Sequence, residues 1–128
     1  TPFGNIGLMV CYDLRFPELA LTLRARGANI LTAPAAFTYT TGQMHWQLLL
    51  QARAMDSQSI VLGAAQQGWH GEKRQTWGHA AATNSRGQVL DLILNPGAQL
   101  ITVPFDLAEQ VQIRESMPLM QHRKLVQF

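Results

Sequence analysis

The sequence predicts an α/β fold in which helices pack against a mixed sheet. Three short, mainly apolar runs, at 6–10, 29–34 and 60–65, have the character of strands that are buried on both faces. Segments with helical spacing lie between them, and this strand–helix–strand order makes neighbouring strands parallel with a right-handed crossover. The rest of the chain shows a hairpin signal, one further strand and a final helix, and the hairpin makes the sheet mixed.

The first predicted helix follows the first strand closely. It begins at Pro17, because the first helical position needs no N–H, and it ends at Gly27. The second strand, over 29–34, ends at Pro34, whose ring lacks the N–H that a strand ladder uses. Two prolines and a glycine therefore bound the first strand–helix–strand unit.

The second helix is predicted over 45–57, where apolar residues recur at three- and four-residue spacing. A loop rich in threonine precedes it over 35–43, and Thr41 or its neighbour is expected to cap the helix. Within this helix, Arg53 and Asp56 are three residues apart, which favours a structural ion pair over a catalytic role.

The chain after the third strand is predicted to be mainly loop and antiparallel strand. The segment 66–76 is expected to be a polar loop, because glycines and charges punctuate it. Two β-runs flank a polar turn that ends in glycine and predict a hairpin, over 79–83 and 88–94. A last strand is expected over 100–103, and Asp106 is expected to cap a last helix that Pro118 closes.

Composition limits the class of protein. Of the 128 residues, 47% are apolar and 14% are charged, which is typical of one globular domain and unlike a disordered chain. The net charge of +2 is too small to indicate a nucleic-acid partner, and no apolar stretch is long enough to span a membrane. A single cysteine forms no internal disulfide, which favours a cytoplasmic location. Because the chain begins at Thr1, almost directly in a buried strand, we expect it to be a piece of a longer protein.

Cys11 is the candidate nucleophile. It lies where the first buried strand gives way to a turn and a helix, so a rigid strand would hold its side chain at the crevice beyond the strand's carboxyl end. A free cysteine is more often a small buried apolar residue, and such a residue would be at home inside the strand. The position of Cys11 at the end of the strand, beside Tyr12, Asp13 and Arg15, favours catalysis.

The octapeptide CYDLRFPE at 11–18 resembles the nucleophile motif of the carbon–nitrogen hydrolase (nitrilase) superfamily. The similarity continues through five short motifs: APAAF at 33–37, HW at 45–46, ARA at 52–54, GH at 78–79 and GQV at 87–89. The segments AAQQG at 64–68 and HGEKR at 70–74 resemble most closely the branch called deaminated glutathione amidases. The resemblance covers the whole chain but only the second half of the family's usual length. It implies an α/β fold, a layered α-β-β-α sandwich, of which residues 1–128 are the C-terminal part.

This resemblance implies a chemistry and a set of roles. The superfamily hydrolyses nonpeptide C–N bonds through a Glu–Lys–Cys triad and a thioester intermediate. Cys11 would be the nucleophile, and the backbone N–H of Tyr12 would donate to the oxyanion. The branch implies a small 2-oxoacid amide, similar to deaminated glutathione, as substrate, a homo-oligomer as the assembly, and no metal or organic cofactor.

The other two triad members are expected outside this chain. In the family that this chain resembles, the Glu and the Lys precede the cysteine, whereas no Glu or Lys precedes Cys11 here. We therefore expect the 128-residue chain to be inactive by itself and its full-length parent to be an amidase. A second interpretation stays open, in which the chain is a catalytically incomplete remnant or a non-catalytic dimerising partner.

Two loops are expected to supply the substrate contacts. Phe37 and Thr41 follow the second strand, and Arg74 follows the third. Both loops leave the carboxyl ends of parallel strands that we expect to neighbour the strand of Cys11, so both would face one crevice. The branch resemblance implies that an arginine such as Arg74 binds a substrate carboxylate; a solvated surface loop is the alternative for this residue.

The remaining charged and imidazole groups have structural interpretations. Arg15 and Glu18, three residues apart, are predicted to form an ion pair that fixes the turn, and Asp13 is expected to have the same function. A histidine base for Cys11 would have to be His79 or His45, and a strand-end histidine bound to the backbone is the favoured alternative. No metal site is expected, since no two histidines have ligand spacing.

Overall fold

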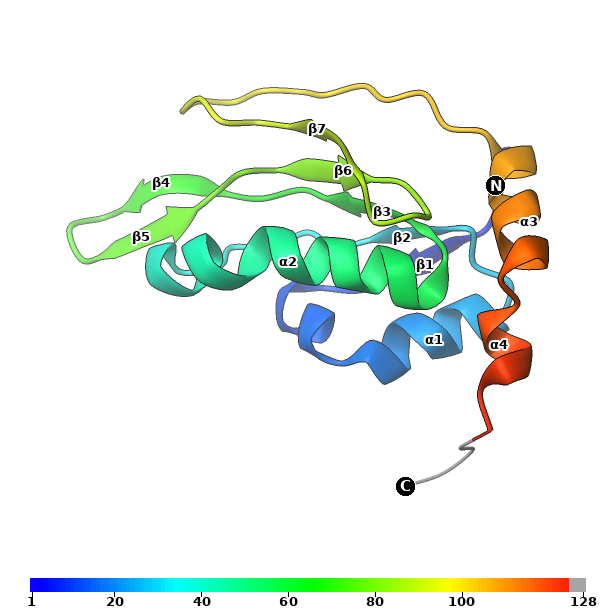
Figure 1. The fold of residues 1–128 in the computed structure, drawn as a ribbon. Coiled ribbons are helices and arrows are strands. Elements are labelled where there is room, and N and C mark those ends of the chain that lie inside the picture. The colour runs from blue at the N-terminus through cyan, green and yellow to red at the C-terminus, as the bar shows by residue number, and fades with distance from the viewer. Residues whose placement is uncertain (125–128) are drawn as a thin grey trace.

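A five-stranded sheet forms the centre of the fold in the computed structural model, which describes residues 1–124. Its strands are β1 (Ile6–Leu8), β2 (Ile30–Thr32), β3 (Ile60–Gly63), β6 (Ala81–Thr83) and β7 (Val89–Leu92). In space their order is β1-β2-β3-β6-β7 (Figure 1). The first three strands are parallel, and β6 and β7 run antiparallel to their neighbours, so the predicted mixed sheet is confirmed.

Two helices cover one face of this sheet (Figure 1). The first, α1 (Pro17–Ala25), begins at the predicted proline, and the second is α2 (Tyr39–Ser57). The core lies between these helices and the sheet, where Trp46 and Leu50 of α2 are buried. Both side chains approach the third strand at Gly63, where an added Cβ would come within 2.8 Å of each. A side chain at this position would push α2 away from the sheet, so close packing of the two layers requires glycine.

The other face of the sheet is apolar and much less covered. Alternate residues of the first strand point to it, and Ile6, Leu8 and Val10 are 44%, 71% and 59% exposed. The extended segment 99–103 lies on this side and encloses a cavity of about 460 Å³ with residues of the middle strands. Within the described residues the fold is thus one sheet with one helical cover, which amounts to half of a layered α-β-β-α sandwich.

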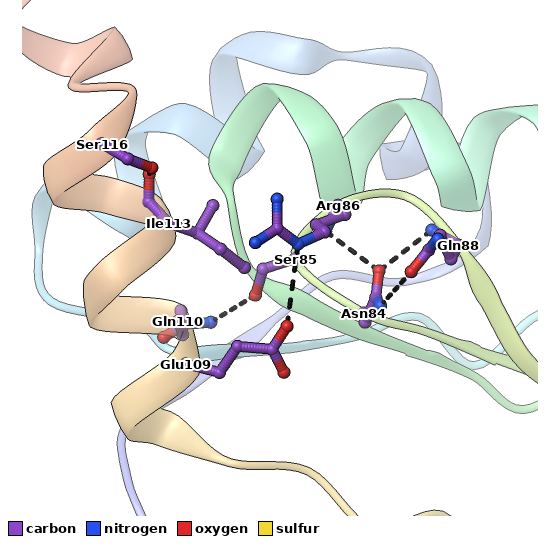
Figure 2. Close-up of polar contacts among 8 residues, drawn as sticks. All are labelled: Asn84, Ser85, Arg86, Gln88, Glu109, Gln110, Ile113 and Ser116. Atoms are coloured by element: carbon purple, nitrogen blue, oxygen red, sulfur yellow. Dashed lines mark hydrogen bonds and ion pairs between the residues drawn. The ribbon is translucent and has the colours of Figure 1, made fainter.

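A buried glutamine anchors the helix α3 (Leu107–Ser116) to the sheet (Figure 2). Gln110 is 2% exposed, and its amide nitrogen donates to Ser85 Oγ and to the backbone carbonyl of Asn29, each at 2.9 Å. Its amide oxygen accepts a hydrogen bond from the Asn29 side chain at 3.1 Å. These bonds tie α3 both to the residue before β2 and to the turn between β6 and β7.

Two predictions for the second half of the chain are wrong. The predicted polar loop over 66–76 is a hairpin of β4 (Gln67–His70) and β5 (Arg74–Trp77) that projects from the main sheet (Figure 1). Its strands lack the alternation of apolar and polar residues that marks a half-buried strand, so the pattern gave no signal. The segment 100–103 forms no strand, because it runs extended without pairing to a neighbour.

The helix bounds differ in one place. α2 begins at Tyr39, well before the predicted start at His45, and Thr38 rather than Thr41 is its N-cap. The first turn was not predicted because glycine, here Gly42, disfavours a helix. An added Cβ at Gly42 would clash with Trp77, so packing requires a glycine inside this helix.

The helix predicted after Asp106 is confirmed, whereas a short helix that follows it was not predicted. Asp106 caps α3, since its carboxylate accepts the N–H of Ala108 at 2.7 Å. The helix ends before Pro118, and a short helix, α4 (Leu119–His122), follows. None of the helices that the structure describes is both long and apolar enough to cross a membrane.

Candidate active site

Cys11 begins a tight turn between β1 and α1. It is the first residue of a 3₁₀ turn, η1 (Cys11–Arg15), and its thiol is free and half-buried. Its φ of +46° lies in the left-handed region, which costs a residue with a Cβ about 1–2 kcal/mol. The N–H of Cys11 donates to the carbonyl of Pro34 at 2.9 Å, so the loop after β2 holds the strained residue in place. Strain of this kind is typical of functional sites, where surrounding contacts maintain it.

Asp13 closes the same turn from the inside. Its carboxylate accepts the N–H of Val10 at 2.8 Å, while its own N–H donates to the Val10 carbonyl at 2.9 Å. The contact of the Asp13 carboxylate corresponds to one half of a capping box, while the Val10 backbone carbonyl replaces the side-chain acceptor of the other half. The expectation that Asp13 fixes the turn is confirmed, although the contact is to the backbone and not to a charged side chain.

The predicted ion pair between Arg15 and Glu18 is wrong. The guanidinium of Arg15 lies 5.2 Å from the ring centre of Tyr12 and 5.4 Å from that of Phe37. It also lies 3.3 Å from Nδ1 of His45, and since an arginine only donates, this nitrogen accepts. Within the described residues, the ion pairs shorter than 4.0 Å are Arg53–Asp56 and Arg86–Glu109, so the predicted Arg53–Asp56 pair is confirmed.

An open hollow of about 520 Å³ borders the thiol of Cys11. Its wall comes from the carboxyl ends of the three parallel strands: Val10, Cys11, Pro34, Ala35, Ala36, Ala64, Ala65 and Gln66. Both predicted loops therefore reach the hollow beside Cys11. The prediction that both loops follow strands next to the strand of Cys11 is wrong in one detail. β2 lies between β1 and β3, so only the loop after β2 follows a neighbour of β1.

The three predicted substrate contacts have different surroundings. Phe37 is 7% exposed and packs against Trp46, with 5.2 Å between ring centres. The hydroxyl of Thr41 lies 2.8 Å from that of Thr38, in the first turn of α2. Arg74 is exposed on β5, and its guanidinium donates to the carbonyl of Ala36, in the wall of the hollow, at 3.4 Å. Arg74 is thus the one that combines an exposed charged group with a position beside the hollow, and all three contacts stay predictions.

The backbone N–H of Tyr12 is available to a ligand. In residues 1–124 it has no backbone or side-chain acceptor, whereas the N–H groups of Cys11 and Asp13 on either side of it are paired. A free N–H next to a nucleophile is the arrangement that an oxyanion donor needs. The predicted role of Tyr12 as that donor is compatible with this pairing and stays a prediction.

Both candidate histidines make structural contacts. Nδ1 of His79 lies 2.9 Å from the carbonyl of Trp77, and the two rings are stacked at 4.0 Å, so the favoured alternative of a strand-end histidine bound to the backbone is confirmed. His45 accepts from Arg15, as described above. No group of three or more metal-ligating side chains occurs in the part of the chain that the structure describes.

Sequence reasoning missed the contacts from α2 to the turn of Cys11. Arg53 is predicted only as the partner of Asp56, yet its guanidinium also donates to the carbonyl of Leu14 at 2.9 Å. His45 and Arg53 are eight residues apart, which is about two helical turns, so both lie on one face of α2. The sequence therefore indicates that both side chains share one face of α2. It does not indicate that this face contacts the turn of Cys11.

Comparison with known proteins decides the family. A family model for carbon-nitrogen hydrolases matches residues 1–115. The chain belongs to the carbon–nitrogen hydrolase family. The curated relatives of this chain include the deaminated glutathione amidase of Yersinia enterocolitica, which is 46% identical over 127 residues, covering 98% of this chain and 44% of that protein.

Two solved structures show the fold of the family. Saccharomyces cerevisiae Nit3, a member of branch 10 of the nitrilase superfamily, has a TM-score of 0.84 and 31% identity, over 94% of this chain and 44% of that one. A mutant of the amidase from Nesterenkonia sp. AN1 has a TM-score of 0.64 and 29% identity, over 70% of this chain and 34% of that one. That structure shows covalent addition of the acetamide moiety of fluoroacetamide at the active site cysteine.

These comparisons confirm the resemblance that the octapeptide at 11–18 indicates, and with it the nitrilase-type α/β fold. The chain spans less than half the length of the relatives that it matches, 44% in the case of the Yersinia amidase.

Proposed function

We propose that this chain is the nucleophile-bearing part of an amidase that hydrolyses a small 2-oxoacid amide similar to deaminated glutathione. The observation that carries the proposal is the position of Cys11, a free thiol on a strained turn at the edge of the hollow. The identity to the Yersinia deaminated glutathione amidase supports the substrate class. The adduct on the active site cysteine of the Nesterenkonia amidase supports the role of nucleophile.

The proposed reaction has two halves. The Cys11 thiol gives its proton to a carboxylate base while its sulfur attacks the amide carbonyl, and the N–H of Tyr12 donates to the oxyanion that forms. The tetrahedral intermediate then expels the amine, which takes the proton from the base, and an acyl thioester on Cys11 remains. Water gives a proton to the same carboxylate and attacks the thioester, which releases the carboxylic acid and returns the proton to the thiol.

The wall of the hollow contributes the position of the thiol and no carboxylate base for this reaction. The wall of the hollow contains no Glu or Lys, and Glu109 lies 3.7 Å from Arg86 on another part of the molecule. In our proposal, the base Glu and the catalytic Lys come from protein that precedes this chain in the natural gene. The 128-residue chain alone is therefore expected to give no steady hydrolysis of an ω-amide.

The experiment compares Cys11→Ser with the wild type in the protein at its full natural length. With an ω-amide of a 2-oxoacid as substrate, the variant should lose at least several hundred-fold in kcat, because a hydroxyl is a far poorer nucleophile without a tuned base. An unchanged thermal midpoint of unfolding controls for loss of fold. Near-full activity in Cys11→Ser would remove Cys11 from the mechanism, and an inactive full-length wild type would favour the remnant or non-catalytic partner.

A homo-oligomeric assembly and a cytoplasmic location accompany this proposal. Light scattering of the full-length protein at several concentrations tests the first, and fractionation of the source cells tests the second. A monomer throughout the concentration range would contradict the expected assembly.

A further inference from the structure

The guanidinium of Arg53 connects α2 to the turn that carries Cys11. Arg53 is 7% exposed, and its Nη1 donates to the backbone carbonyl of Leu14 at 2.9 Å. Leu14 is fully buried and belongs to the same five-residue turn as Cys11. We propose that Arg53 is a positioning residue for the nucleophile: it fixes the far end of the turn and thereby the location of the Cys11 sulfur. This inference rests on the proposed function of Cys11.

The burial of Arg53 requires an explanation beyond the stability of the helix. Its Nε is buried and has no partner among the described residues, which is costly for a donor removed from water. Its ion-pair partner Asp56 is 41% exposed at the side chain, so the two charges could meet at the surface without Arg53 entering the core. An apolar residue of similar size is often at least as stable in such a place. The contact that only a buried arginine makes here is the one to Leu14.

Contacts at both ends hold the turn, and Arg53 makes one of those at its far end. At the start, Cys11 N–H donates to the carbonyl of Pro34 at 2.9 Å. At the end, Arg53 binds the Leu14 carbonyl, and His45 accepts from the Arg15 side chain at 3.3 Å. The backbone carbonyl of Leu14 lies inside the fold, so without Arg53 it would be left unpaired and the turn would shift to reach another donor. A shift of about 1 Å at a nucleophile can reduce the rate about 100-fold.

The test measures kcat and KM for an ω-amide in the full-length protein, with rates expressed per Cys11 thiol that iodoacetamide can label. Arg53→Lys keeps the positive charge beside Asp56 but cannot bind the carboxylate and the Leu14 carbonyl as a fork. We expect kcat per labelled site to fall about 10- to 100-fold with KM changed less than about twofold. The pH dependence of the rate of Cys11 alkylation should also differ from that of the wild type, because the surroundings of the sulfur change.

Two matched variants separate positioning from stability. Arg24→Met removes another guanidinium-to-carbonyl bond, from Arg24 Nη1 to Ser57 at 2.8 Å, at the last residue of α2 and away from the turn of Cys11. Asp56→Asn weakens the ion pair at 2.8 Å and leaves the contact to Leu14 in place. Both should lower the thermal midpoint and leave kcat per labelled site within about twofold of the wild type.

Three outcomes decide the inference. A wild-type kcat per labelled site and an unchanged alkylation profile in Arg53→Lys would overturn it, as would an equal loss of kcat in Arg24→Met. The thiol of an unfolded chain is labelled too, so the rate per labelled thiol is divided by the folded fraction of Arg53→Lys at the assay temperature, which denaturant unfolding measures. If Cys11→Ala retains turnover, the proposed function fails instead, whatever Arg53→Lys does.

Discussion

The left-handed backbone at Cys11 can be tested by comparing two substitutions that both remove the thiol. Cys11→Ala keeps a Cβ at φ +46°, whereas Cys11→Gly has none and adopts this conformation without strain. The control is Ala52→Gly, because Ala52 is also half-buried but lies in the middle of α2.

The expected magnitudes follow from the two backbone conformations. In the helix, Ala52→Gly should cost about 1 kcal/mol, from the greater freedom of glycine in the unfolded chain and its lower helix propensity. At Cys11 the same entropic cost is offset by relief of about 1–2 kcal/mol of left-handed strain. Cys11→Gly should therefore equal Cys11→Ala in stability or exceed it by up to about 1 kcal/mol.

Denaturant unfolding of the full-length protein measures these differences, and thermal midpoints check them. A difference of 1 kcal/mol corresponds to about 2–4 °C in proteins of roughly 150–250 residues. If Cys11→Gly is less stable than Cys11→Ala by about 1 kcal/mol, as expected at Ala52, then no strain is stored at the nucleophile. The reasoning that links the shape of the turn to catalysis would then be wrong.

Three further predictions concern other parts of the molecule. Arg74→Ala should raise KM for an amide with a free carboxylate and leave a neutral amide little affected; equal effects in steady-state kinetics would point to a structural role. Gln110→Leu should lower the free energy of unfolding by about 2–4 kcal/mol, because it leaves buried polar groups unpaired, while Glu109→Gln at the exposed pair should cost less than about 0.5 kcal/mol, both measured in denaturant. The 128-residue chain should self-associate in light scattering through its open sheet face, and Leu8→Asp should reduce this; no change would locate the association elsewhere.

Local patterns predicted the parts of the fold that local physics determines. Pro17, Gly27 and Pro34 bound the first strand–helix–strand unit, and each acts through its own backbone. The hairpin of β4 and β5 could not be predicted in this way. Its strands are stabilised by cross-strand backbone pairing and by a β-bridge between Thr38 and Thr76. Neither contact produces a periodic pattern of apolar residues in the sequence.

The same limit explains what was predicted of the site. Cys11 was found because its place at the end of an apolar run is a local feature. Arg15 was paired with Glu18 because only near neighbours are visible in a sequence, whereas its actual contacts are two rings and a histidine 30 residues away. The contact from Arg53 to Leu14 joins residues 39 apart and depends on the way α2 crosses the turn.

The structure separates the two requirements of the proposed catalysis. Contacts that hold the turn of the proposed nucleophile lie within the described residues: the Pro34 carbonyl, the Asp13 carboxylate and the Arg53 guanidinium each hold one part of it. The groups that would move protons are absent from the wall of the hollow. We therefore expect the isolated chain to present a thiol that can be labelled but not to turn over an amide, because orientation and proton transfer depend on different groups. The uncovered apolar face beside Leu8 also supports a base from outside this chain. In our proposal another part of the full-length protein covers this face, and such a layer would come close to the end of β1 and hence to Cys11.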